Sequence, residues 1–272
     1  MSNLTIRIIS AIVMILGGFA ALLLNLESRW FIIAVITVVG AWELSRLVDR
    51  KFTSQNLSWF SMISALAFSL PYFPGIVFPL YWIWMVCIVS LVVNLLMGFK
   101  FLDIEVMAPW ILMKAAVCIY MGLWATRLFA LTNSQLGWAG IGPLAFTITV
   151  VAAEDTGAYA AGRTLGKHKL APHISEKKTI EGTIGGTLAG MIVAGILGPK
   201  LVGINVLPAV LLGAVLALAA AAGDLFISVI KRYAGAKDTS NLIPGHGGIM
   251  DRFDALVFVA PMAWLGLKLL AG

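Results

Sequence analysis

The sequence predicts an all-α protein, a polytopic transmembrane helical bundle of about nine spans. Its 272 residues are 60% hydrophobic and only 12% charged, whereas soluble domains are about half apolar and a quarter charged. Apolar runs of about 17–25 residues recur along the whole chain. Most of these runs lack the polar face that a helix on the surface of a soluble protein needs.

The predicted spans are separated by short polar loops. They cover residues 8–26, 30–48, 57–73, 76–97, 107–131, 138–162, 183–198, 207–230 and 253–270. The third and seventh are short, so a tilted or re-entrant element at either place would change the count by one or two. The N-terminal run lacks a convincing cleavage site and is therefore predicted to be a retained span.

Basic residues alternate between successive loops. The N-terminus and the second, fourth, sixth and eighth loops are basic, whereas the third and fifth carry no charge. The positive-inside rule then places the N-terminus in the cytoplasm and the C-terminus outside, and a bacterial cytoplasmic (inner) membrane is expected. The same rule accounts for the net charge of +6, so no nucleic-acid partner is predicted.

The two halves of the chain differ in their acidic residues. Of 13 Asp and Glu, eight follow residue 150, as do all three histidines. Residues 1–150 are therefore predicted to be scaffold spans and residues 151–272 the catalytic half of one continuous membrane domain. Glu43 and Lys114 lie inside scaffold spans. A structural role, by snorkelling or by pairing between helices, is favoured about two to one over a role in a substrate path.

The most informative stretch, residues 223–254, reads GDLFISVIKRYAGAKDTSNLIPGHGGIMDRFD. Charge between two apolar spans is costly and points to function. Asp224, Ser228 and Lys231 have the spacing of one helix face, and Asp251 and Asp254 share the first turn of the last span. Three carboxylates without a Cys or His cluster suit Mg²⁺ better than zinc.

Other groups near these carboxylates suit phosphates. Between the two helices, IPGHGG supplies a turn whose backbone N–H groups can point inward. The predicted phosphate binders in this segment are Lys231, Arg232, Lys237, His246 and Arg252. Together with the carboxylates, they predict transfer at phosphorus on a lipid substrate at the cytoplasmic side.

The region before this segment adds a second polar group. The adjacent pair Glu154 and Asp155 lies deep in a span, and a functional role is favoured about three to one over an internal ion pair. The following loop holds Lys177 and Lys178, which suit phosphate, although a cytoplasmic basic loop is equally expected in any membrane protein. The glycines that follow at four-residue spacing predict a close helix contact; they are Gly182, Gly186 and Gly190.

Residues 228–254 follow the pattern S-x-x-K-R-x4-K-D-x6-P-G-H-G-G-x2-D-R-x-D. This pattern resembles the signature of phosphatidate cytidylyltransferases, also called CDP-diacylglycerol synthases. The upstream GDL, DTGAY, GR-x2-GK-x-KLAP-x-IS and KKT-x-EG segments are similar to other motifs of that family, in the same order. The resemblance covers residues 154–254, while the first 150 residues agree only in length and hydropathy.

The resemblance implies an enzyme that condenses CTP with phosphatidate to give CDP-diacylglycerol and pyrophosphate, with Mg²⁺ held by Asp224 and Asp251. It further implies that a monovalent cation such as K⁺ can accompany the magnesium, and that the protein forms homodimers in the membrane. The predicted catalytic residues are Asp224, Asp251, Lys231 and Asp155. The predicted substrate-binding residues are Lys177, Lys178, Ser228, Arg232, Lys237, Asp238, His246 and Arg252. The predicted metal ligands are Asp224, Asp251 and Asp254.

Four positions depart from the family pattern: Ile227, Glu176, Asn241 and Ala255. Ile227 matters most, because the family places a glutamate there, one turn after Asp224. Two other functions stay open. A CTP-dependent lipid kinase of the polyprenol or phytol type would transfer the γ-phosphoryl group. An ion or phosphate transporter would use the buried carboxylates, but the first half holds no second copy of either acidic motif.

Overall fold

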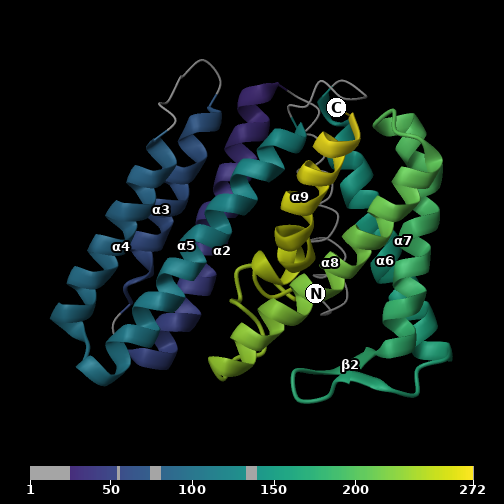
Figure 1. Cartoon of the computed structure of the whole chain (residues 1–272). Coiled ribbons are helices and arrows are strands. Elements are labelled where there is room, and N and C mark those ends of the chain that lie inside the picture. The colour runs from purple at the N-terminus through teal and green to yellow at the C-terminus, as the bar shows by residue number, and fades with distance from the viewer. Residues whose placement is uncertain (1–24, 54–55, 74–80, 133–139, 272) are drawn as a thin grey trace. The chain divides into compact units, whose positions relative to one another are not determined.

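The computed structural model describes residues 25–53, 56–73, 81–132 and 140–271 (Figure 1). These residues form eight α-helices, which confirms the predicted helical class. The helices are α2 (Leu26–Phe52), α3 (Ser58–Ser69), α4 (Trp82–Phe101), α5 (Ile104–Thr132), α6 (Gly142–Thr164), α7 (Ile180–Leu201), α8 (Val206–Tyr233) and α9 (Met250–Ala271). A short 3₁₀ helix, η1 (Leu70–Tyr72), follows α3, and two strands, β1 (Lys169–Ala171) and β2 (Ser175–Thr179), join α6 to α7.

Six of the described helices are long and apolar enough to cross a membrane, namely α2, α4, α5, α7, α8 and α9. Helix α3 has only 12 residues, fewer than the roughly 20 that a crossing needs. Helix α6 has 23 residues, but Glu154, Asp155 and many small or hydroxyl residues lower its hydropathy. Most of the predicted first span lies outside the described residues, so the count of nine is not confirmed.

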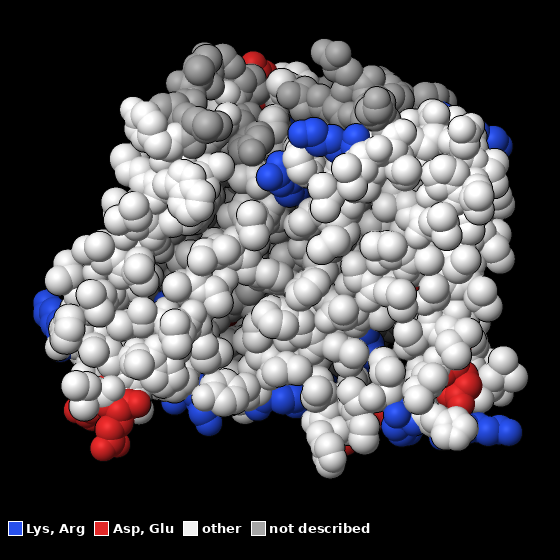
Figure 2. All heavy atoms as spheres, viewed as in Figure 1, with Lys and Arg blue, Asp and Glu red and all other residues white. Residues whose placement is uncertain are grey.

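The exposed surfaces of several helices are apolar. On α4, large side chains such as Trp84, Ile88, Leu96 and Phe99 are exposed. Figure 2 shows a surface on which uncharged side chains cover broad continuous areas and Lys, Arg, Asp and Glu are few. Exposed apolar surface of this extent marks contact with lipid or a partner, and together with the long apolar helices it indicates a multi-pass membrane protein.

The described chain packs as two compact units. The first comprises Met1–Phe129 and Ile230–Arg252, and the second comprises Ala130–Val229 and Phe253–Gly272. The boundaries fall inside α8 and α9. These units are defined by packing. The assignment of residues 1–150 to a scaffold and of residues 151–272 to catalysis therefore stays a prediction.

In the first unit, polar side chains connect the helices. Lys114 on α5 lies 2.7 Å from the carboxylate of Asp49 on α2, and both side chains are buried. The Lys114 ammonium also donates to Ser45 Oγ, and Trp110 Nε1 donates to Asp49 at 3.0 Å. The predicted structural pairing of Lys114 is confirmed, because a buried ammonium in an apolar span requires such partners.

In the second unit, α6 and α7 lie side by side (Figure 1), and glycines allow their close approach. A Cβ added at Gly186 would lie 2.7 Å from Glu154 O, and one at Gly182 would lie 2.9 Å from Ala158 O. At Gly190 the nearest atom would be Ala217 Cβ of α8, at 3.0 Å. The predicted close helix contact of these glycines is thus confirmed.

Candidate active site

A β-hairpin in the second unit positions the first group of charges. Strands β1 and β2 pair in antiparallel fashion, with Lys169 opposite Thr179. Glu181 in the first turn of α7 fixes the base of the hairpin by accepting from the backbone N–H groups of Lys167 and His168 at 3.1 and 3.2 Å. We expected only a basic loop here, because S-E-K-K-T lacks the apolar alternation that normally predicts a strand.

The hairpin separates two lysines that are adjacent in sequence. In β2, Lys177 is exposed and Lys178 is half-buried. Lys178 Nζ lies 2.8 Å from the carboxylate of Asp224 on α8 and 3.3 Å from Ala221 O. Two residues from separate sequence motifs therefore meet, and only one of the two lysines reaches the carboxylate.

The carboxylate pair of α6 belongs to the same cluster. The Asp155 carboxylate interacts electrostatically with both Asp224 and Lys178. Glu154 is buried whereas Asp155 is exposed. In the second unit, the predicted catalytic residues Asp155 and Asp224 therefore lie near the half-buried ammonium of Lys178, whose positive charge opposes the repulsion between them.

The first unit holds a second aspartate with a lysine partner. Asp251 Oδ1 accepts from Lys231 Nζ at 2.7 Å. Its Oδ2 accepts from the backbone N–H groups of Thr239 and Gly248 at 2.8 and 2.9 Å and lies 3.0 Å from Thr239 Oγ1. The side chain is only 6% exposed, so these donors replace the water that burial removes.

The predicted turn in IPGHGG is present. Ile243 N donates to Gly247 O at 2.8 Å, and Gly245 and Gly247 have φ values of 77° and 84°. This left-handed backbone favours glycine. The backbone N–H of Gly248 points to Asp251, and the Arg252 guanidinium donates to His246 O at 2.8 Å. The inward N–H was predicted, but its partner is a carboxylate of the protein.

Glu43 of α2 has the predicted structural role, because its carboxylate connects α2 to the loop after α8 and to the start of α9. Its carboxylate is fully buried and accepts from Ser240 Oγ at 2.6 Å and from the backbone N–H groups of Ile249 and Met250 at 2.9 and 2.8 Å. Thr239 Oγ1 lies 3.0 Å from Glu43 and 3.0 Å from Asp251, so its one proton serves either carboxylate. The only sequence signal is an acidic residue within an apolar span.

The other predicted site residues occupy varied positions. Ser228 Oγ lies 3.4 Å from Asp224 Oδ1, and Asp254 Oδ1 accepts from Ala255 N at 2.9 Å. Arg232 is exposed and donates to Ala236 O at 3.2 Å. Lys237 and Asp238 are exposed on the loop after α8, and His246 is half-buried. Ile227, where the family pattern has glutamate, is fully buried and provides no ligand.

The predicted metal ligands have one kind of donor atom. Asp224, Asp251, Asp254 and the Ser228 hydroxyl offer only oxygen, which hard cations prefer. Among the residues that the structure describes, no three or more His, Cys, Asp or Glu side chains form a group that could hold a metal. Mg²⁺ at nucleotide sites commonly takes one or two carboxylates and completes its shell with phosphates and water.

Comparison with known proteins places the chain in a family. The model of the cytidylyltransferase family matches residues 5–270. Phosphatidate cytidylyltransferase of Staphylococcus haemolyticus (strain JCSC1435) is 31% identical over 264 residues, 94% of this chain and 96% of that protein. Phosphatidate cytidylyltransferase of Staphylococcus aureus (strain COL) is 34% identical over 236 residues, 84% and 85% of the two chains.

A more local similarity involves a protein of Escherichia coli (strain K12) named "Uncharacterized protein YnbB". It is 40% identical over 117 residues, which is 43% of this chain and 39% of that protein. The family assignment depends on the matches that cover most of the chain. Because the family model spans residues 5–270 and two relatives exceed 30% identity over most of both chains, this protein belongs to the cytidylyltransferase family.

Proposed function

We propose that this protein is a phosphatidate cytidylyltransferase, which forms CDP-diacylglycerol and pyrophosphate from CTP and phosphatidate in phospholipid biosynthesis. The observation that carries this proposal is the alignment of 94% of the chain with 96% of a relative of that name. The two aspartate–lysine pairs in a protein rich in apolar helices support it, because the reaction joins a charged nucleotide to a membrane lipid.

In this reaction, a phosphate oxygen of phosphatidate attacks the α-phosphorus of CTP. The new P–O bond forms while the bond from the α-phosphorus to the bridging oxygen breaks, and pyrophosphate leaves. A phosphate monoester is mostly ionised near neutral pH, with a second pKa of about 6. The enzyme therefore needs no strong general base, and its main tasks are orientation and charge neutralisation.

The lysines are suited to charge neutralisation. An ammonium has three N–H donors, so Lys178 and Lys231 can each keep an aspartate partner and still donate to a substrate phosphate. The exposed residues Arg232, Lys237 and Arg252 would bind other phosphate oxygens, with Ser228, Asp238 and His246 completing the substrate contacts. Lys177 would attract CTP from solution, and Asp155 would add a polar group beside Asp224 and Lys178.

Asp224 and Asp251, with Asp254, are the proposed ligands of magnesium, and K⁺ is the proposed second cation. When bound, magnesium supplies positive charge that stabilises the phosphates and the pyrophosphate leaving group. The protein's own contribution is to orient these carboxylates and to offset part of their charge. Lys178 and Lys231 do so through their ion pairs with Asp224 and Asp251, and the amides of Thr239 and Gly248 orient Asp251.

Product analysis tests the proposal. Purified protein in detergent with Mg²⁺, phosphatidate and CTP labelled in the cytidine should yield labelled CDP-lipid and pyrophosphate. In a parallel assay with phytol or a polyprenol as the acceptor, formation of a lipid phosphate together with CDP would instead identify the kinase alternative. Absence of turnover, combined with nucleotide-independent transport in proteoliposomes, would identify the transporter.

The membrane arrangement is part of the same proposal. We place the N-terminus and the active site on the cytoplasmic side of a bacterial inner membrane, with about nine spans. The basic residues of the second, sixth and eighth loops support this orientation. A homodimer formed through the membrane spans is proposed from the family resemblance.

A further inference from the structure

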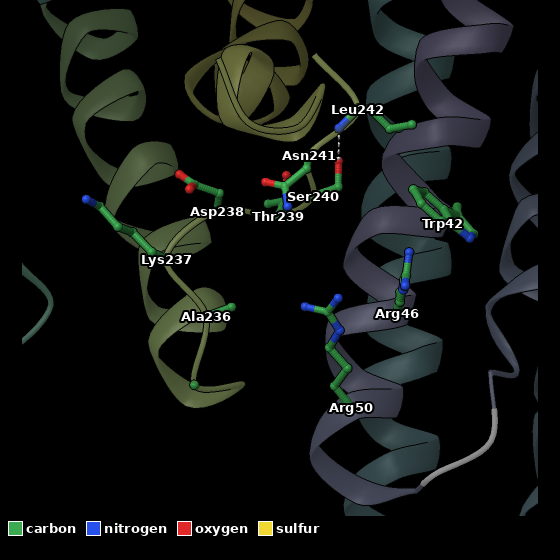
Figure 3. Close-up of a pocket in the computed structure, with 11 residues that line it drawn as sticks. Trp42, Arg46, Arg50, Ala236, Lys237, Asp238, Thr239, Ser240, Asn241 and Leu242 are labelled. Carbon is green, nitrogen blue, oxygen red and sulfur yellow. Dashed lines mark hydrogen bonds between the residues drawn. The ribbon is translucent and has the colours of Figure 1, made fainter. Parts of the chain in front are cut away.

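A cavity in the first unit has lining groups that the predicted site does not include. Its volume is about 480 Å³, and it lies between α2 and the loop formed by residues 235–242 (Figure 3). Helix α2 contributes Trp42, Arg46 and Arg50, which follow one another at four-residue intervals. This spacing places the three side chains on one helix face, and cavities of about 300–1,000 Å³ are the usual size of small-molecule sites.

The two arginines form no ion pair with another described residue. Among the residues that the structure describes, no carboxylate lies within ion-pair distance of Arg46 or Arg50. Like charges four residues apart on a helix repel one another. Arg46 lies over the Trp42 ring, 5.2 Å from its centroid, which restricts its orientation. An anion in the cavity would relieve the repulsion between the arginines.

The charges around the cavity define the ligand that fits. Figure 3 shows the Arg50 guanidinium extending from α2 toward the loop, whereas the Lys237 ammonium extends away from both arginines. Arg46 and Arg50 thus supply two positive charges from α2, and Asp238 on the loop supplies one negative charge. A phosphate monoester carries about −1.5 to −2 charges at pH 7, and the guanidinium fork matches phosphate oxygens in bidentate geometry.

The loop that borders this cavity also forms hydrogen bonds with the predicted metal ligand Asp251 of α9. Ser240 and Thr239 bond to Glu43, and Thr239 N donates to Asp251 at 2.8 Å. A ligand in the cavity would therefore touch the segment that orients the Asp251 carboxylate. We propose that Arg46 and Arg50 form a binding site for a dianionic phosphate group. Its attribution to a substrate or product of cytidylyl transfer rests on the proposed function.

Two sources could supply this phosphate: the headgroup of phosphatidate, or the free phosphates of CTP and pyrophosphate. The test measures equilibrium binding of a short-chain phosphatidate, CTP and pyrophosphate to the full-length protein in detergent, by calorimetry and without turnover. In the double variant Arg46→Gln/Arg50→Gln, affinity for at least one probe should fall about tenfold or more, since charge-assisted hydrogen bonds are lost. Lys51→Gln removes a neighbouring charge that does not line the cavity, and should change affinity less than about twofold.

Each result bears on the proposal. A loss confined to phosphatidate assigns the lipid headgroup, a loss confined to CTP or pyrophosphate assigns a free phosphate, and a shared loss assigns a site open to both. Equal affinity of the double variant and Lys51→Gln for all three probes contradicts the site. Turnover of the wild-type protein, assayed in parallel, reports separately on the proposed function.

A second measurement needs no variant. Phenylglyoxal modifies accessible arginines, and peptide mapping of the wild-type protein gives the rate at each position. A bound phosphate should slow modification of Arg46 and Arg50 at least about threefold, while the exposed Arg163 should react at an unchanged rate. Unchanged rates at Arg46 and Arg50 with saturating concentrations of all three probes would contradict the proposal.

Discussion

Each of the two principal aspartates has its own lysine. Asp224 and Lys178 are partly exposed, with 38% and 23% of their side chains accessible, whereas Asp251 and Lys231 are 6% and 12% accessible. Burial weakens solvation, so the second pair depends more on its mutual attraction and on the amides of Thr239 and Gly248. Asp251 is therefore important both for the expected chemistry and for the local structure.

Replacement of either aspartate by the isosteric amide should abolish most of the activity. Asp224→Asn and Asp251→Asn remove the negative charge but keep the side-chain shape, so CTP-dependent turnover of phosphatidate should fall below about a tenth of wild type. Asp103→Asn, at an exposed position before α5, is the matched control and should retain full turnover. Activity above a tenth in either site variant would argue against its assignment as a magnesium ligand.

The adjacent lysines of β2 should differ in their kinetic effect. Lys178→Gln removes the partner of Asp224, so kcat should fall about tenfold or more. Lys177→Gln removes an exposed charge, so we expect a KM for CTP raised a few-fold, with an effect that shrinks as ionic strength rises. Steady-state kinetics at low and high salt separate the two effects. Equal losses of kcat in both variants would contradict the different roles of the two lysines.

At the scale of the element, Glu43 determines how α9 begins. The first N–H groups of a helix have no partner within the helix, and a carboxylate there also interacts favourably with the helix dipole. Glu43 supplies this carboxylate from α2, more than 200 positions earlier in the chain, to Ile249 N and Met250 N. It also binds the Ser240 hydroxyl, so one side chain holds both the loop and the start of α9.

Loss of this carboxylate should destabilise the protein. Glu43→Ala leaves several buried donors without an acceptor, so the free energy of unfolding should fall by about 2 kcal/mol or more. Thermal unfolding in detergent, followed by circular dichroism, measures the change. Glu105→Ala in the exposed first turn of α5 is the control, with an expected loss below about 1 kcal/mol. Similar losses in both variants would show that the Glu43 hydrogen bonds are dispensable.

Helix α7 shows how a membrane helix can reverse the pattern of a soluble one. Its buried positions are Gly182, Gly186, Gly190, Ala194 and Gly198. Its exposed positions include Ile184, Leu188, Ile192 and Ile196. Small residues therefore face neighbouring helices and large apolar residues face outward, as expected where lipid replaces water. This pattern is local, so it could be interpreted from the sequence.

At the scale of the whole molecule, the proposed orientation places the two ends of α7 on opposite sides of the membrane. Impermeant maleimide tests this in a background of Cys87→Ser and Cys118→Ser. In right-side-out spheroplasts, Asn205→Cys should be labelled from outside, whereas Lys177→Cys should react only after the membrane is opened. Labelling of both in detergent is the control for reactivity. Labelling of both in intact spheroplasts would contradict the proposed orientation.

The sequence by itself determined the class of the protein, the approximate positions of the eight described helices, the glycine contacts of α7 and the residues expected to do chemistry. Hydropathy and short spacings suffice for these features, because they depend on neighbouring residues. The family resemblance in residues 154–254 agrees with the family match over residues 5–270. The number of spans could not be predicted as well. Helix α3 is short and α6 is less hydropathic than the six long apolar helices, and the length of an apolar run alone does not show where a helix ends.

Only the tertiary structure decided which charges are partners. Lys178 lies beside Asp224 because a hairpin with little sequence signal brings β2 to α8. Glu43 contacts Thr239, Ser240 and the start of α9 across a long separation in the chain. The cavity lined by Arg46 and Arg50 likewise forms where α2 lies beside the loop of residues 235–242, which follows α8. Such contacts arise when distant segments pack together, and no local pattern of residues encodes them.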